Sequence, residues 1–111
     1  MPPASNQDLI VTIIKKGYAE QVIEASRKAG AEGATIMFGR GTGIHEQKKL
    51  LGIPIEPEKE IIFVVVPAEI SAKVLEAIIK AGKLERPATG IAFVLELKKV
   101  AGVAHLLREQ G

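Results

Sequence analysis

The sequence predicts an α+β fold of the ferredoxin-like type, a double βαβ sandwich in which two helices cover one face of a four-stranded antiparallel sheet. The first observation behind this prediction is an internal repeat. A shift of 52 positions places Val22-Ile-Glu-Ala25 on Val74-Leu-Glu-Ala77 and Lys28-Ala-Gly30 on Lys80-Ala-Gly82. The second is that each half has the pattern strand, helix ending in Ala-Gly, strand. A tandem of such units in 111 residues has one common solution, this sandwich.

Each element has its own signal. Apolar, β-branched runs predict the first strand of each half, and Gly30 and Gly82 are expected to end the two helices, whose apolar residues recur with helical spacing. In chain order we expect strand 9–15, helix 19–29, strand 33–38, strand 60–66, helix 70–81 and strand 91–97, with a short amphipathic helix over 100–109.

Composition limits the class of protein. Hydrophobic residues make up 47% of the chain and charged residues 25%, which is typical of one globular domain spanning 1–111. A net charge of +2 without an aromatic-laced basic patch argues against nucleic-acid binding. The chain has no cysteine, no visible signal peptide and no apolar run of the roughly 20 residues that span a bilayer. We therefore expect a soluble cytoplasmic protein.

The two central strands do not alternate between apolar and polar residues. Leu-Ile-Val-Thr-Ile-Ile and Ile-Ile-Phe-Val-Val-Val are apolar on both faces, although the helices of this fold cover only one. The other face would expose apolar surface to water at about 25 cal/mol per Å². We expect further copies of the same sheet to cover it, so the sequence predicts an oligomer.

The segment between the second and third strands, about 43–59, is long for so compact a domain and shows no regular periodicity. Such loops are usually functional or mobile. Its stem, Gly39-Arg-Gly-Thr-Gly43, suits an anion-binding nest of backbone N–H groups, and a hairpin bulge without a ligand fits the stem equally well. A dinucleotide fingerprint is rejected because no helix follows and the third glycine is missing. Glu56, Glu58 and Glu60 alternate near a strand start and are interpreted as a solvated edge.

Five motifs occur in a recognisable order along the chain: the Gly30–Thr35 opening of the second strand, Gly41-Thr-Gly43, Pro57-Glu-Lys59, Val64-Val-Val-Pro67 and Thr89-Gly-Ile-Ala-Phe-Val94. Together they resemble the PII family of trimeric signalling proteins over nearly the whole chain. The resemblance implies a homotrimer, with a nucleotide bound between subunits at the base of the long loop. It places the following residues at that site: Gly33, Thr35, Gly41, Thr42, Gly43, Lys59, Val65, Thr89 and Gly90.

The chain also departs from the family pattern. Ile44 and His45 stand where the family has arginine and glutamine. The positions of the family's two phosphate-binding arginines fall near Gly102 and Ala104 of this chain. Charge-assisted contacts of this kind contribute roughly 1.5–3 kcal/mol each. The candidates to replace them are Arg40, Lys83, Arg86, Lys98 and Lys99. The loop has no Tyr or Ser between Gly43 and Glu60, so the covalent modifications of classical members lack an acceptor.

The resemblance implies a regulatory protein. Nitrogen regulation is expected only because it is the known role of the family. An effector such as ATP, ADP or AMP would reshape the loop, whose apolar tip suits insertion into a partner enzyme or membrane transporter. No acid/base or nucleophile constellation stands out, so we expect no enzyme activity. His45 and His105 lack further ligands at metal spacing, so no metal site is predicted. The alternative is a metal-handling or structural trimer like the CutA family, without nucleotide binding.

Overall fold

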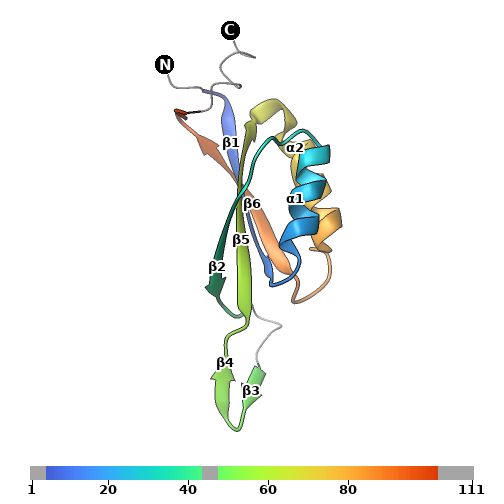
Figure 1. Cartoon of the computed structure of the whole chain (residues 1–111), viewed down its shortest axis with the longest axis vertical. Helices are drawn as coiled ribbons and strands as arrows, with labels where there is room; N and C mark the ends of the chain where they lie inside the picture. The colour runs from blue at the N-terminus through green and yellow to red at the C-terminus, as the bar shows by residue number, and fades with distance from the viewer. Residues whose placement is uncertain (1–4, 44–47, 103–111) are drawn as a thin grey trace.

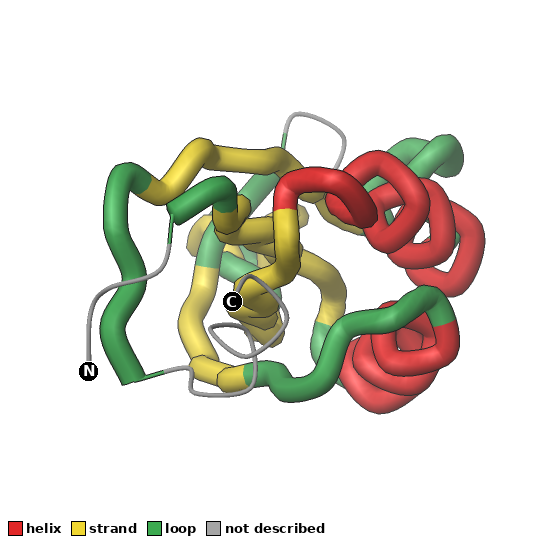
Figure 2. Tube along the Cα trace, turned by 90° about the horizontal axis from the view of Figure 1, so that it is seen from above, coloured by secondary structure: helices red, strands yellow, loops and turns green. Residues whose placement is uncertain are grey.

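The structure, a computed structural model, describes residues 5–43 and 48–102. Its main sheet has four strands in the order β2-β5-β1-β6, and all three pairings are antiparallel. Both helices pack on one face of this sheet (Figures 1 and 2). The expected fold class is confirmed. The elements are β1 (Gln7–Lys15), α1 (Ala19–Lys28), β2 (Thr35–Arg40), β3 (Lys48–Leu50), β4 (Ile53–Ile55), β5 (Glu58–Pro67), α2 (Ala68–Gly82) and β6 (Gly90–Leu97).

The residues matched by the internal sequence repeat occupy equivalent buried positions in the core. Ile10 of β1 and Ile62 of β5, which the 52-residue shift superimposes, are both fully buried beneath the helices. Val22 of α1 and Val74 of α2 form a second fully buried pair. Burying such side chains contributes about 1.5–3 kcal/mol each. Equivalent positions in the two halves therefore stabilise the same layer between helices and sheet.

The two helices end differently. Gly30 follows α1 with φ of +120°, as expected for a glycine after a helix end. In α2 the last helical residue is Gly82 itself, and the left-handed cap is Lys83, with φ of 54°. A Cβ on Gly82 would come within 2.8 Å of the Ile14 side chain. Gly82 therefore allows α2 to approach β1 closely, and the expected role as helix stop belongs to Lys83.

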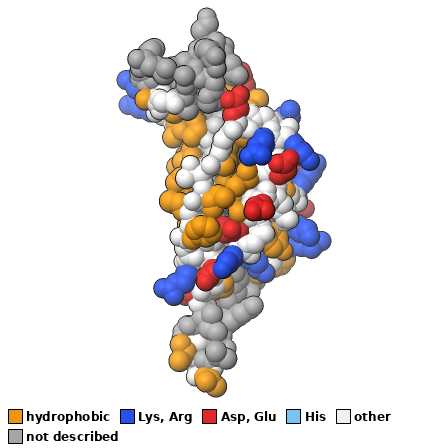
Figure 3. Space-filling view, viewed as in Figure 1, with side chains coloured by type: hydrophobic (Ala, Val, Ile, Leu, Met, Phe, Trp, Pro, Cys, Tyr) orange, Lys and Arg blue, Asp and Glu red, His pale blue; other side chains and the backbone are white. Residues whose placement is uncertain are grey.

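The sheet face opposite the helices is apolar. Strand register places Val11 beside Phe63 and Phe93 in one row across this face, and Leu9 beside Val65 and Leu95 in the next. Phe93 and Leu95 are 41% and 45% exposed, and Figure 3 shows hydrophobic side chains gathered along the sheet. The described chain has no second layer over this face (Figure 2). The expectation that both faces of the central strands are apolar is confirmed.

The segment expected to lack regular structure contains a β-hairpin. Strands β3 and β4 pair antiparallel, with Leu50 opposite Ile53, and project from one end of the main sheet (Figure 1). Leu51 and Gly52 form the two-residue turn with φ of 53° and 81°. Positive φ at both turn residues suits the twist of a tight hairpin. The absence of apolar periodicity was misleading because three-residue strands are too short to show it.

The helix expected over 100–109 lies mostly outside the described residues. No helix within the described ranges is long and apolar enough to cross a bilayer.

Candidate functional site

A cavity of about 320 Å³ opens where the hairpin leaves the sheet. It lies at the end of the main sheet from which β2 runs out toward the hairpin and to which β5 returns. Residues from four strands and the hairpin stem line it: Ile13, Arg40, Gly41, Thr42, Gly43, Lys59, Ile61, Gly90 and Ile91. Five of the nine residues expected at a ligand site are therefore neighbours, namely Gly41, Thr42, Gly43, Lys59 and Gly90.

The apolar part of the cavity is a row of three isoleucines. Ile13 of β1 lies directly opposite Ile61 of β5 on one side and Ile91 of β6 on the other. Side chains paired across an antiparallel sheet project to the same face, so the three form a continuous strip on the face away from the helices. This strip can receive an apolar ring or chain.

The charged part of the cavity comes from the two strands that flank the hairpin. Lys59, the second residue of β5, is only 7% exposed, while Arg40, the last residue of β2, is exposed. The ladder pairs Gly39 with Lys59, so a residue without a side chain lies next to the lysine on the edge strand. A buried lysine is uncommon because desolvating an ammonium group is costly. Lys59 and Arg40 make this cavity suited to an anion.

A backbone hydrogen bond from the Gly41 N–H to the Pro57 carbonyl (3.1 Å) closes the hairpin stem. That donor is therefore occupied. Neither Gly39 nor Gly41 has φ in the left-handed range, so the expected nest of N–H groups at positive φ does not occur at these two glycines. The backbone beyond Gly41 and the side chains of Arg40 and Lys59 are the remaining candidates for contacts with an anion at the stem.

Gly90 is required by close packing of the backbone. A Cβ there would overlap the Ile13 carbonyl oxygen and lie 2.9 Å from the Ile14 Cα. Thr89 has a structural role in this loop. It is 6% exposed, and its hydroxyl lies 2.9 Å from both the Lys83 and the Arg86 carbonyl oxygens. Thr89 holds the loop between α2 and β6 together, and its side chain does not line the cavity.

Three expected site residues lie elsewhere. Thr35 is opposite Phe63, and Val65 is opposite Leu9, both on the apolar sheet face. Gly33 is in the exposed loop before β2. Val65 is six residues beyond Lys59 on the same strand, about 20 Å at 3.3 Å per residue. Within one chain these residues do not join the cavity.

Sequence reasoning missed a group of contacts beside the cavity that hold the β1–α1 turn. Glu60 accepts hydrogen bonds through Oε1 from the Gly17 N–H (2.6 Å) and the Ala19 N–H (3.1 Å), so a β5 carboxylate stabilises the start of α1. Lys16 Nζ lies 2.8 Å from Glu58 Oε2. The interpretation of these glutamates as a solvated edge is confirmed for Glu56 and Glu58, which are exposed. It is wrong for Glu60, which is half-buried and holds the β1–α1 turn. The alternation gave no signal of these contacts because the partners are about 40 residues away.

The Lys16–Glu58 pair changes the titration of both groups. The hydrogen bond from Lys16, and then its charge, lower the pKa of Glu58. The same hydrogen bond and charge raise the pKa of Lys16. Both side chains are more than 60% exposed, so solvent screens the pair strongly.

No described residues form a group of three or more His, Cys, Asp or Glu that could hold a metal ion. His45 and His105 lie outside the described residues.

The family model of nitrogen regulatory protein P-II matches residues 7–105. The chain belongs to this family. Its fold also resembles that of Arabidopsis thaliana PII in a crystal structure bound to citrate, with 24% sequence identity and a TM-score of 0.70 over 90% of this chain and 85% of that one. No curated protein gives a significant match. Family membership makes this chain a P-II-type regulatory protein and confirms the resemblance read from its motifs.

Proposed function

We propose that this P-II family member binds a small anionic effector, foremost an adenine nucleotide (ATP, ADP or AMP), and controls a partner enzyme or membrane transporter through its hairpin. The observation that supports this most directly is where the cavity charges lie. Arg40 ends the strand that leads into the hairpin, and Lys59 lies in the strand that leads out of it. An anion held by both therefore contacts both legs of the hairpin.

The proposed assembly is a homotrimer. The open sheet face is apolar and includes Ile91, which is 57% exposed and also lines the cavity. Covering this face with further copies removes that surface from water. A trimer also gives Gly33, Thr35 and Val65 a role. These residues of one subunit can reach the cavity of the neighbouring subunit, which that subunit's Lys59 and Gly90 line.

The hairpin is suited to recognising a partner. Leu51 at its turn is 94% exposed and Ile53 is 67% exposed, and Figure 3 shows this hydrophobic group apart from the main body. An effector changes docking only if it contacts the two states of the hairpin differently. The Gly41–Pro57 bond closes the stem next to the cavity, so a ligand at Arg40 and Lys59 is placed to favour one hairpin geometry over another.

Calorimetry with AMP, ADP, ATP, citrate and bicarbonate, and separately with divalent metals, tests the effector class. We expect nucleotide binding with modest affinity and weak discrimination between phosphate numbers, because the cavity supplies few cations. Lys59→Gln should weaken binding more than tenfold, since a charge-assisted contact contributes roughly 1.5–3 kcal/mol. Lys73→Gln, which removes an exposed charge from α2, is the matched control.

Gly43→Val provides an independent test, because it adds bulk at the stem and leaves the sheet unchanged. It should abolish nucleotide binding and preserve the oligomer. Normal binding by this variant, or no binding of any nucleotide to the wild type at millimolar concentration, would show that the nucleotide assignment is wrong. Metal binding without nucleotide binding would favour the CutA-like alternative.

A further inference from the structure

Among the described residues, the most exposed large apolar side chain lies at the turn of the hairpin. Leu51 is 94% exposed, and Ile53, two residues later, is 67% exposed. We call these two residues the apolar tip. The hairpin extends away from the main sheet, and Figure 3 shows its apolar group apart from the main body. Apolar surface of this kind, held in water at the end of a projecting element, is typical of a contact site.

The backbone conformation makes leucine an unexpected residue at this turn. Leu51 has φ of 53°, in the left-handed region, and Gly52 follows with φ of 81°. Two-residue hairpin turns of this geometry favour Asn, Asp or Gly at the first position, because a larger side chain strains the backbone. Strained residues are kept mainly where they serve a function. The folding of the hairpin therefore does not explain Leu51, which indicates a role for its apolar side chain.

Two lysines lie behind the apolar tip. Lys48 and Lys49 are the first two residues of β3, three and two residues before Leu51. At 3.3 Å per residue of extended strand, they start about 10 and 7 Å from the turn. The sequence has no acidic residue within three residues of the turn on either side. The hairpin therefore places positive charge directly behind exposed apolar side chains.

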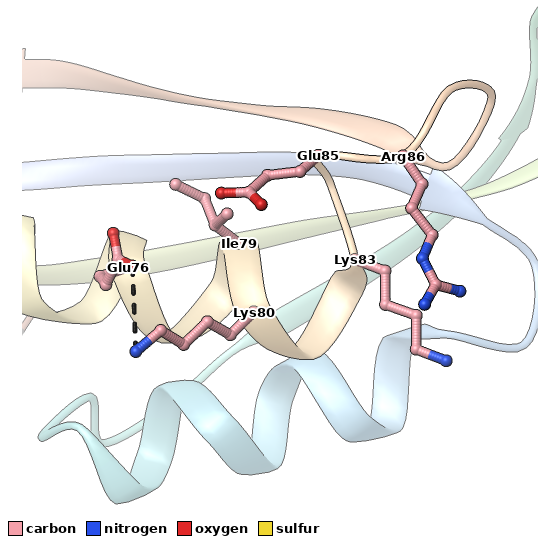
Figure 4. A pocket seen from close by; sticks show the side chains of 6 residues that line it. All are labelled: Glu76, Ile79, Lys80, Lys83, Glu85 and Arg86. Carbon is pink, nitrogen blue, oxygen red and sulfur yellow. Dashed lines mark ion pairs between the residues drawn. The ribbon is translucent and has the colours of Figure 1, made fainter.

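The end of α2 gives a contrast within the same chain. There Lys80 Nζ lies 4.0 Å from Glu76 Oε1, and Glu85 is in the same loop as Lys83 and Arg86 (Figure 4). Mixed charges of this kind largely offset one another at a distance. The hairpin instead combines one sign of charge with an apolar end, which suits a surface that is negative outside and apolar inside.

We propose that the hairpin binds directly to an anionic lipid bilayer, with Leu51 and Ile53 inserted and with Lys48 and Lys49 at the lipid phosphates. The spacing between turn and lysines matches the depth of about 5–10 Å to which interfacial apolar groups are buried. Lysines at an anionic membrane surface add electrostatic attraction. A pocket in a partner protein would account for the apolar tip but not for the layer of cations behind it.

The proposed trimer increases the strength of this contact. A rotation axis leaves the height along itself unchanged, so the three turns of a cyclic trimer lie at one height and can meet a flat surface together. One short apolar group binds a bilayer weakly, whereas three linked groups bind with higher avidity. The membrane proposal rests on the proposed function for the trimer alone and needs no effector.

Sedimentation of the full chain with protein-free vesicles tests this proposal. Vesicles of phosphatidylcholine with about one third phosphatidylglycerol should carry the protein down, and phosphatidylcholine alone should carry down much less. Lys48→Gln and Lys49→Gln should each weaken binding about fivefold or more. The double variant Lys28→Gln/Lys73→Gln, which removes two exposed charges from the helices, should bind like the wild type.

Leu51→Asn tests the apolar contribution without strain at the turn, since asparagine suits positive φ. It should abolish vesicle binding, whereas Phe38→Asn, which removes a 73% exposed side chain from β2, should not. The chain contains no tryptophan, so Leu51→Trp adds a single fluorescent reporter. Its emission should shift to shorter wavelength with anionic vesicles, and the emission of Phe38→Trp should stay unchanged.

The proposal is overturned if the wild type does not sediment with anionic vesicles, if Leu51→Asn binds them undiminished, or if the emission of Leu51→Trp does not shift. The first result would leave a protein as the partner of the tip. Calorimetry with nucleotides in the absence of vesicles tests the effector separately. A lack of nucleotide binding would therefore leave membrane binding standing, and a lack of vesicle binding would leave the effector standing.

Discussion

The sandwich of sheet and helices and the projecting hairpin use the same residue types for opposite purposes. Ile78 of α2 and Val64 of β5 are 0% and 1% exposed, whereas Ile53 and Leu51 of the hairpin are 67% and 94% exposed. The sandwich is stabilised by apolar side chains taken out of water, and the hairpin by its own backbone pairing and turn. A change at the cavity between them can therefore move the hairpin without disturbing the sandwich.

Two glycines that both line the cavity should show this difference most strongly. Gly90→Val places a side chain against the Ile13 carbonyl and the Ile14 backbone, so we expect a loss of more than about 3 kcal/mol and little folded protein. Gly41→Val meets nothing within 4 Å of its Cβ and should change the free energy of unfolding by less than about 1 kcal/mol. Urea denaturation followed by circular dichroism measures both. Equal losses would mean that the stem is packed as tightly as the sheet.

The same substitution, isoleucine to alanine, compares the sandwich with the hairpin at two positions. Ile78→Ala removes a fully buried side chain and should cost about 2–5 kcal/mol, from lost burial and the cavity that remains. Ile53→Ala, at the hairpin, should cost less than about 0.5 kcal/mol. If Ile53→Ala were as destabilising, the hairpin would have to pack against the body or another subunit in the free protein. Thermal unfolding of the two variants beside the wild type decides this.

Two phenylalanines test which surface is covered by assembly. Phe93 lies on the open sheet face and is 41% exposed. Phe38 is 73% exposed on the edge strand β2, opposite Glu60 and so on the helix side. Phe93→Asp should convert the proposed trimer to monomer at micromolar concentration, because it buries a charge among apolar side chains. Phe38→Asp should leave the trimer intact. Light scattering across a wide concentration range reports both, and a monomeric wild type would contradict the assembly.

The elements of the sandwich could be predicted because their periodicity reflects burial. The strand 9–15 and the helix 19–29 differ from β1 and α1 by two residues or fewer at each end. The 52-residue repeat aligns Ile10 with Ile62, and both are buried. The hairpin could not be predicted in this way. Its strands are three residues long, and its turn places Leu51 in the left-handed conformation that usually selects Asn, Asp or Gly.

Part of the candidate site could be predicted because the fold class determines which strands are neighbours. Lys59 and Gly41 are close to each other because β2 and β5 are neighbours, which the fold class already requires. The roles of Thr89 and Glu60 depend on single contacts with loop carbonyls and with the β1–α1 turn, and such contacts leave no periodic pattern in a sequence. Thr35 and Val65 were grouped with the cavity by family resemblance. Within one chain neither lines it, and Val65 lies six residues, about 20 Å, beyond Lys59 along β5.

The smallest expected effect concerns the Lys16–Glu58 pair, which joins the sandwich to the strand returning from the hairpin. Because Lys16 lowers the pKa of Glu58 below its ordinary value of 4.5, the pair stabilises the fold above that value and loses its contribution as the pH falls through the lowered pKa. Lys16→Met should raise the pKa of Glu58, and Lys28→Met should not. Carboxyl-carbon NMR titration measures both. An unchanged Glu58 midpoint in Lys16→Met would mean that solvent screens this pair completely and that the backbone alone holds the returning strand to the turn.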